Sequence, residues 1–395
     1  MSLQESRREF LRIVPALAGG SLVLGRLPSA AAEAPAQRVD PPKLTVISGD
    51  PGERGHQYGR LFRQEVQSFL DREIYARFAG HPDSKDKLLS YAGACGKAIR
   101  EYSPVAHSEL VGIAAGAGIR PEEAVLITLH EELGHAKDVK KIEHCTAVAV
   151  GPPDTRDGHT YVGQSWDWMK SVAGLSSMLL WKRADGPSVL AYAYPGLWVG
   201  AGMNSSGIAL CWTSAAFKQE ASGPRVGIPS YVLLTHLLYQ NSLEEIKREA
   251  RRATAAGWFT FVLGDSRGNL LNIEGSPQEI AIEEHRGRLA RVMYGSRQMT
   301  KTPAGAQPKF YPRCEKMYQL LGNKNNDAAA LKNYFSDRQA GICVGDSTLD
   351  MMIFDTTARE ALVSRGPSYS PNWQRFGFEG VITRQSSADA RQAAG

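Results

Sequence analysis

The chain has 395 residues, of which 43% are hydrophobic and 22% are charged, and its formal net charge is +5. These proportions are typical of a globular protein with enough apolar side chains for a large core, in one large domain or several smaller ones. A chain this close to neutral carries too little positive charge for nucleic acid to be its main partner.

The N-terminal segment has the pattern of an export signal. Arg7 and Arg8 precede an apolar stretch, Ile13–Leu24, and small residues follow at Ala30–Ala36. A charged start, a short apolar core and an Ala-x-Ala exit are typical of secretory signals, and paired arginines resemble the twin-arginine type. A membrane anchor is the alternative, but the apolar stretch is shorter than the roughly 20 residues that span a bilayer. We expect residues 1–36 to be signal and linker, and the mature protein to be periplasmic or secreted without stable membrane insertion.

The next part of the chain is mainly helical. Leu44–Ser48 predicts a strand, and the glycines after it predict a turn. The pattern is then helical, as in Tyr58–Leu70 and Pro121–Leu133, and proline suits a first helical turn. We assign residues 37–144 to this helical segment.

From Cys145 the chain reads as strands joined by tight turns. Cys145–Val150 predicts a strand, Pro152–Gly158 a turn and His159–Trp166 the return strand. Further strands are expected at 178–183, 188–194, 197–202, 208–212, 258–263 and 270–274, twice more before Tyr294, and at 351–355 and 361–364. Helices are expected at 231–239, 243–255, 313–321 and 328–335. This order of hairpins and helices predicts an α+β layered sandwich.

Three familiar motifs are incomplete here. His130 and His135 are five residues apart, whereas zinc-protease histidines are four apart on one helical face, so we predict no metal site. Gly264–Gly268 matches the G-x-S-x-G pattern of serine esterases around Ser266. That elbow needs a following helix, and the residues that follow here alternate like a strand. Ser205 stands where a dinucleotide motif needs its third glycine. We therefore expect no cofactor.

Cys145 is the candidate nucleophile. The four other cysteines are expected to be small buried hydrophobic residues: Cys95, Cys211, Cys314 and Cys343. Cys145 opens a strand directly after the helical segment, and a cut between His144 and Cys145 would make it a new N-terminus. Its α-amino group, with an ordinary pKa of about 8, would then serve as the base for its thiol. The thiol can make the cut itself by attacking the carbonyl of His144.

Five segments, in this order, resemble those of one family: Gly52–Gly55 with Tyr58-Gly59, Cys145–Ala149, Gly163–Trp168, Gly202–Gly207 and Asp265–Pro277. The third reads Gly-Gln-Ser-Trp-Asp-Trp and is similar to the family's Gly-Gln-Asn-Trp-Asp-Trp. The last is similar to its Asp-x-x-Gly … Glu-x-x-Pro hairpin. The chain resembles the acyl-coenzyme A:6-aminopenicillanic-acid acyltransferases, kin of choloylglycine hydrolase and penicillin V acylase.

The resemblance implies an N-terminal-nucleophile (Ntn) hydrolase with a four-layer αββα sandwich. In that fold residues 37–144 would form an α chain and residues 145–395 a β chain of one domain. Cys145 would be the nucleophile, and Asp167 would hold its α-amine and thiol. A strand and return strand bring Asp167 beside Cys145 independently of the family, although Asp167 as a simple turn cap is the alternative.

Some other site residues follow from the resemblance alone. Arg313 matches an arginine at a helix start, with a surface arginine as the alternative. Thr213 and Ser214 match the strand that lines the substrate pocket. Independently of the family, Trp166 is a further candidate for an apolar acyl pocket, as are Trp168, Trp198 and Trp212, although aromatic residues on strands are more often plain core.

The chain departs from the family in two places. The asparagine expected to stabilise the oxyanion is absent from Met293–Arg297, which leaves a backbone N–H near Tyr294 or Gly295 as the candidate donor. The residue before the nucleophile is His144 rather than a small one.

The predicted activity is hydrolysis of a small-molecule, linear, non-peptide amide through an acyl-thioester on Cys145. Export away from cytosolic coenzyme A favours hydrolysis over acyl transfer. Transfer of the acyl group to an amine and a ligand-binding protein without catalysis are the two alternatives.

Overall fold

The computed structural model describes six stretches of the chain: residues 40–79, 82–136, 145–214, 225–292, 311–366 and 370–381. The predicted export signal, His144 and Tyr294 lie outside them. The signal, the α-chain and β-chain boundaries and the cleavage site therefore stay predictions.

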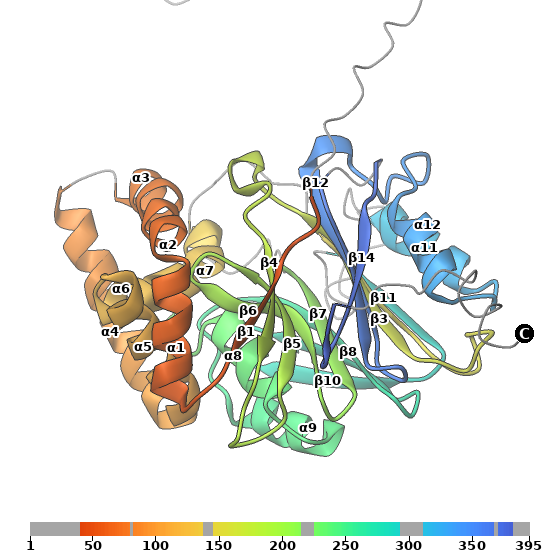
Figure 1. Cartoon of the computed structure of the whole chain (residues 1–395), viewed down its shortest axis with the longest axis horizontal. Helices are drawn as coiled ribbons and strands as arrows, with labels where there is room; N and C mark the ends of the chain where they lie inside the picture. Colours follow the sequence, from red (N-terminus) through yellow and green to blue (C-terminus); the bar gives the residue numbers. More distant parts are fainter. Residues whose placement is uncertain are drawn as a thin grey trace, which may run out of the picture. The chain divides into compact units, whose positions relative to one another are not determined.

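Two large sheets lie face to face at the centre of this part of the chain (Figure 1). The first has eight strands in the order β1 (Leu44–Ile47), β4 (Ser177–Trp181), β5 (Val189–Tyr194), β6 (Leu197–Asn204), β7 (Ile208–Ser214), β8 (Phe259–Asp265), β9 (Leu270–Gly275) and β10 (Ile280–His285). The second has seven, in the order β11 (Arg288–Arg291), β2 (Thr146–Val150), β3 (Tyr161–Asp167), β12 (Thr348–Asp355), β13 (Glu360–Arg365), β14 (Trp373–Gly377) and β15 (Gly380–Val381). β1 and β4 run parallel, and the other recorded pairs are antiparallel.

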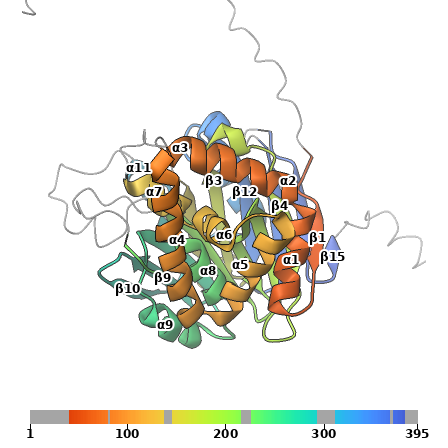
Figure 2. The same cartoon turned by 90° about the vertical axis from the view of Figure 1, so that its left-hand side faces the viewer.

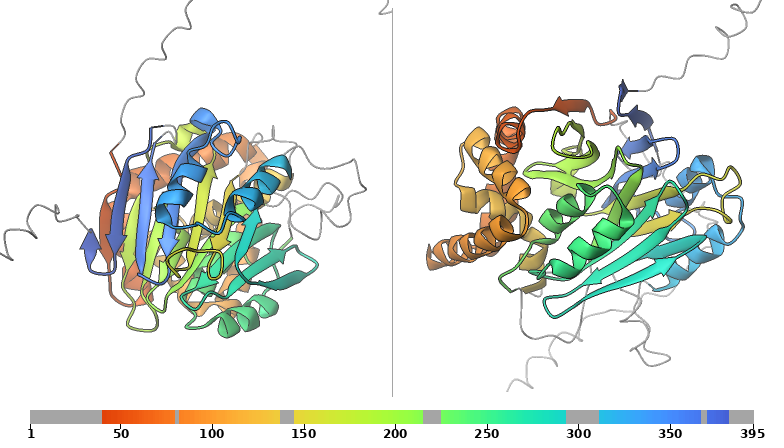
Figure 3. Two further views of the ribbon diagram at one scale, coloured as in Figure 1. Left: turned by 90° about the vertical axis from the view of Figure 1, so that its right-hand side faces the viewer. Right: turned by 90° about the horizontal axis from the view of Figure 1, so that it is seen from below.

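Helices cover the outer faces of both sheets (Figures 2 and 3). On the side of the eight-stranded sheet are α1 (Pro51–Leu61), α2 (Arg63–Phe69), α3 (Ala76–Phe78), α4 (Pro82–Tyr102), α5 (Pro104–Ala117), α6 (Pro121–Thr128), α7 (His130–Ala136), α8 (Ser230–Leu238) and α9 (Leu243–Arg252). On the other side α11 (Tyr311–Leu321) and α12 (Ala328–Phe335) pack against the seven-stranded sheet. The predicted αββα sandwich is confirmed. No helix in the described stretches has the length and apolar character needed to cross a bilayer.

The sequence of β2 follows from its place between two layers. Ala147 and Ala149 belong to the core between the two sheets, whereas Val148 and Val150 pack under the outer helices α11 and α12. A strand that is buried on both faces is apolar at every position instead of alternating. This explains the apolar run Ala147–Val150 that follows Thr146.

The glycines after the first strand have two roles. Gly49, with φ +121°, lies in the expected turn, and α1 begins directly after it at Pro51 with Asp50 as its cap. Gly55 brings α1 against α5 backbone to backbone, since a Cβ on Gly55 would lie 2.0 Å from the carbonyl oxygen of Glu109. The same holds for Gly59, where it would lie 2.2 Å from the oxygen of Ile113. Glycine is the residue that permits such contact.

Predictions elsewhere on the chain are mostly correct. The Ser266 motif is a hairpin turn between β8 and β9, as expected. Cys95, Cys211, Cys314 and Cys343 are all buried and free, as expected. β14 and β15 were not predicted, since they are short and lie at the end of the sheet.

A buried carboxylate ties the helical segment to the eight-stranded sheet. Glu109 on α5 accepts hydrogen bonds from Arg54 Nε at 3.1 Å and Nη2 at 2.8 Å. It also accepts from Trp181 Nε1 at 2.9 Å, Trp198 Nε1 at 3.0 Å and Tyr239 Oη at 2.6 Å. Trp198 therefore belongs to this network and is a core residue, which was the alternative to a place in a substrate pocket.

Candidate active site

Cys145 stands directly before β2, at the edge of the space between the two sheets. It shares the face of Ala147, because side chains two residues apart in a strand point the same way. Its side chain is partly exposed and packs against the core between the sheets. Its Sγ lies 3.9 Å from the backbone carbonyl oxygen of Asp167. The first residue of the predicted β chain thus reaches a surface that a substrate can approach.

Asp167 and Arg313 form a buried ion pair beside this cysteine. Thr146 pairs with Ser165 in the antiparallel β2–β3 ladder, which carries Asp167, the last residue of β3, past the level of Cys145. Arg313, in the first turn of α11, donates from Nη1 to Asp167 Oδ2 at 2.8 Å. The Asp167 side chain is fully buried and that of Arg313 is 8% exposed. All three predicted catalytic residues therefore meet, and Arg313 is not a surface residue.

A pocket of about 370 Å³ opens at the thiol. It is lined by Glu131, Cys145, Trp166, Asp167, Trp168, Trp212 and Ser214. The indole rings pack on one another, with Trp166 at 5.9 Å from Trp168 and 6.3 Å from Trp212 between centroids. Two strands of opposite sheets, β3 and β7, and the short helix α7 supply this lining. The cavity is therefore mainly aromatic, with acidic groups at its edge.

The thiol is held in its neutral form in the uncut chain. Burial raises the pKa of Cys145 to about 12, and the negative charges of Asp167 and Glu131 contribute to the rise. A backbone hydrogen bond at Asp167 and the side-chain amide of Gln164 act in the opposite direction. Since a thiol is nucleophilic as thiolate, Cys145 needs a base close by.

Gln164 is a site residue that the sequence analysis missed. It lies on β3, its side chain is buried, and its Oε1 accepts a hydrogen bond from the backbone N–H of Trp212 at 3.0 Å. That bond joins the two sheets. Because Oε1 is the acceptor in it, the other end of the side-chain amide is the Nε2 donor. Nε2 makes no formed hydrogen bond with a described residue, and the thiol is the reactive group that it faces. Its position two residues before Trp166, on the same strand face, was the available signal.

The other predicted substrate residues divide into three groups. Trp166 and Ser214 line the pocket, as do Trp168 and Trp212. Thr213 does not line the pocket, because neighbouring residues of a strand face opposite sides. Its buried hydroxyl donates to the Ser214 carbonyl. Tyr294, the candidate region for an oxyanion donor, lies outside the described residues. The sequence analysis missed Glu131, because a helical pattern does not predict which part of the fold the end of that helix will contact.

The His130 region has a packing role. His130 Nδ1 is bonded to the carbonyl oxygen of Ile127 at 3.0 Å, and its ring packs beside Phe69, Trp168 and Tyr231. In the described stretches no group of three His, Cys, Asp or Glu side chains is arranged to hold a metal ion.

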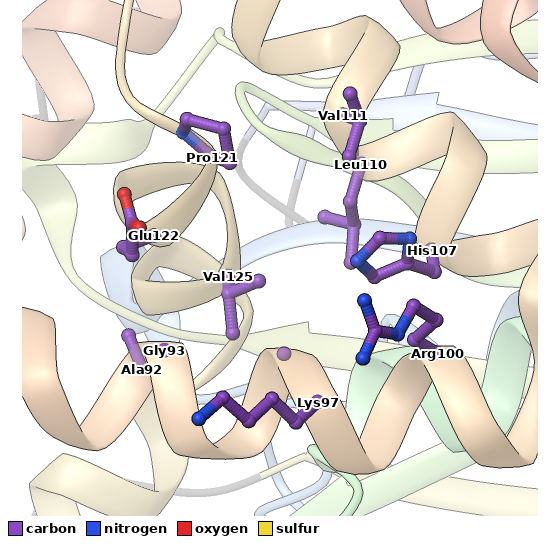
Figure 4. A pocket seen from close by; sticks show the side chains of 11 residues that line it. Ala92, Gly93, Lys97, Arg100, His107, Leu110, Val111, Pro121, Glu122 and Val125 are labelled. Carbon is purple, nitrogen blue, oxygen red and sulfur yellow. The ribbon is translucent and has the colours of Figure 1, made fainter.

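A larger hollow of about 470 Å³ lies away from this chemistry, among α4, α5 and α6 (Figure 4). Figure 4 shows Arg100 and His107 directed toward one another at one end, with Lys97 and Glu122 farther along. Burial, followed by the charge of Arg100, lowers the pKa of His107. None of its lining residues is a cysteine, serine or threonine. The smaller pocket at Cys145 is therefore the candidate active site.

Two solved structures are similar to this chain. Penicillin V acylase from Agrobacterium tumefaciens is similar at 13% identity, over 59% of this chain and 86% of that one, with a TM-score of 0.41. A mutant conjugated bile acid hydrolase from Clostridium perfringens is similar at 13% identity, over 61% and 97%, with a TM-score of 0.42.

A family model matches more than half of the sequence. It covers residues 154–361, a range that includes Asp167 and Arg313 and begins after Cys145. The chain belongs to the acyl-coenzyme A:6-aminopenicillanic acid acyl-transferase family.

Proposed function

We propose that this protein is an exported, self-processing amide hydrolase with Cys145 as its nucleophile. The observation that carries the proposal is the meeting of Cys145 with the buried Asp167–Arg313 pair at the mouth of an aromatic pocket. The substrate would be a linear, non-peptide amide of a small molecule. Family membership supports acyl chemistry of this kind.

Self-cleavage would precede turnover. The Cys145 sulfur attacks the carbonyl carbon of His144 and loses its proton. The peptide C–N bond breaks, a thioester forms, and the nitrogen takes up a proton to become the free α-amino group of Cys145. Water then splits the thioester, which frees the carboxyl group of His144 and restores the thiol.

In turnover the new α-amino group replaces the missing base. It accepts the thiol proton, and the sulfur adds to the substrate carbonyl. The same proton passes to the leaving amine as the C–N bond breaks. Water, deprotonated by the α-amine, releases the acid from the acyl-thioester and regenerates the thiol. Asp167, fixed by Arg313, would position the α-amino group, since its own charge raises rather than lowers the pKa of the thiol.

Gln164 would stabilise the thiolate through Nε2. A hydrogen bond to a charged group contributes about 1.5–3 kcal/mol, so we expect Gln164→Glu to lower kcat/KM by about 10- to 100-fold while it keeps the acceptor for Trp212 N–H. The pH midpoint of alkylation by iodoacetamide should rise. Gln164→Met removes the donor without adding charge. An unchanged midpoint in both variants would show that the amide does not act on the sulfur.

Intact-mass analysis of the purified wild-type protein tests the whole proposal. We expect two chains, the second beginning at Cys145 and ending at Gly395, and turnover of at least one member of an amide panel. Ser266→Ala should leave both results as they are, whereas a serine esterase would lose activity. An uncut wild-type chain without turnover would contradict the proposed function. Adding an amine acceptor to the assay distinguishes acyl transfer from hydrolysis.

A further inference from the structure

The pocket beside Cys145 has the composition of a cation site. Three indole rings form its walls, from Trp166, Trp168 and Trp212. Its polar lining is acidic or neutral: Glu131 and Asp167 carry carboxylates and Ser214 a hydroxyl, while no Lys, Arg or His is among its described lining residues. The faces of aromatic rings attract cations, indole most strongly, and a nearby carboxylate adds to the attraction.

Glu131 differs from Asp167 in what its carboxylate faces. Asp167 is fully buried against Arg313 at 2.8 Å, whereas the Glu131 side chain is 19% exposed and reaches the cavity. The imidazole Nε2 of His130 lies 3.4 Å from Glu131 Oε1, and that ring is itself packed against Trp168. Glu131 is thus the less buried of the two carboxylates that line the pocket.

The short helix that carries Glu131 is firmly anchored. Its neighbour Glu132 is fully buried and accepts two hydrogen bonds at the start of α8, from Ser230 N at 2.8 Å and Ser230 Oγ at 2.7 Å. An acidic side chain is favourable at a helix N-terminus because of the exposed N–H groups there. This contact fixes α7 over the pocket and therefore fixes the place of Glu131.

The charge of Glu131 is felt by the groups around the pocket. After burial, it is the next cause of the raised pKa of Tyr231, and it contributes to the raised pKa of Cys145. Tyr231 packs edge-on against Trp212 at 4.8 Å between centroids. The negative charge of Glu131 therefore acts on two groups near the pocket, the Cys145 thiol and the Tyr231 hydroxyl.

We propose that this pocket selects amides that carry a positively charged ammonium group a few bonds from the scissile carbonyl. The inference rests on the proposed amide hydrolysis and names its substrate class. The ammonium would lie between Glu131 and the indole faces, with the carbonyl at Cys145. An uncharged group of the same size would lose both the charge attraction and the cation–π contact.

Matched amides test this inference. One series has p-nitroanilides of ω-amino acids with four to six carbons, each beside the uncharged alkanoyl anilide of equal length. A second series places the ammonium on the amine side, as hexanoyl diamines beside hexanoyl alkylamines. We expect kcat/KM to favour the cationic member by about tenfold or more in at least one series. Glu131→Gln should reduce that ratio by about threefold or more, because the charge attraction is lost while the cation–π contact with the indole rings remains. The exposed control Glu101→Gln on α4 should leave the ratio unchanged.

The two proposals fail separately. Turnover that favours the uncharged member in both series, or a cation preference that is as large in Glu131→Gln as in the wild type, overturns the inference and leaves the hydrolase intact. Should the chain be uncut and inactive, the same amide pairs are titrated by tryptophan fluorescence. Tighter binding of the cationic member that is weakened in Glu131→Gln would then support the pocket without the catalysis, and equal binding would overturn it.

Discussion

The Cys145→Ala variant is expected to purify as one uncut chain and to lose amide turnover by about a thousandfold or more. The sulfur is the group that would form the thioester in both reactions, and no second cysteine lines the pocket. Without the cut, the α-amino base is also missing, so two catalytic groups disappear with one substitution. Intact-mass analysis and turnover of the best amide substrate measure the two effects.

A matched control separates chemistry from folding. Cys145 is partly exposed, so its truncation to alanine removes few packed contacts, and the thermal unfolding midpoint should stay close to that of the wild type. Cys95→Ala, on α4 in the helical segment, should remain cut and active. If Cys145→Ala is cut before residue 145, or retains turnover, the nucleophile lies elsewhere.

The largest effect on stability is expected from Glu109→Gln. Glu109 accepts five hydrogen bonds in a fully buried site, and one of its partners is the buried Arg54 guanidinium. A glutamine has one acceptor oxygen, so its NH₂ group would face at least two donors. The guanidinium would lose its fully buried carboxylate partner and keep only the ion pair with the more exposed Asp185, at 3.2 Å. Loss of one member of a buried ion pair costs about 3–5 kcal/mol.

Urea unfolding measures that cost directly. The free energy of unfolding of Glu109→Gln should fall by about 3–5 kcal/mol, with little change in the slope against urea. Glu101→Gln makes the same chemical change at an exposed position on α4, and its free energy of unfolding should stay within about 0.5 kcal/mol of the wild type. If the two variants were equally stable, the five hydrogen bonds of Glu109 would contribute no more to the free energy of unfolding than the hydrogen bonds to water that replace them in the unfolded chain.

The sequence was most informative where local pairing decides the structure. A strand, a tight turn and a return strand predicted Asp167 beside Cys145, and the β2–β3 register agrees with this. The position of Arg313 came from family resemblance alone, because an arginine 146 residues away along the chain leaves no local signal. The αββα layering likewise came from the resemblance, since strand and helix patterns do not say which sheet a strand joins.

The failures have physical causes as well. Gly55 and Gly59 let α5 approach α1 so closely that no side chain fits between, and local sequence does not reveal this role. Trp198 could equally be a pocket residue or a core residue by its strand position, and its hydrogen bond to Glu109 shows that it belongs to the core. Glu131 became visible as a site residue only when elements distant in sequence were packed together, whereas Gln164 had a signal in its place two residues before Trp166. Packing partners of this kind are set by tertiary structure, which no window along the sequence records.

The Glu109 network also affects how the mature enzyme would unfold and refold. Its carboxylate and Arg54 precede residue 145, whereas Trp181, Trp198 and Tyr239 follow it. Once the chain is cut, these groups belong to separate polypeptides that share one core. Refolding from urea would then change from a first-order event in the precursor to a second-order encounter between two chains. The mature protein would recover more slowly as it is diluted, while the uncut precursor would not.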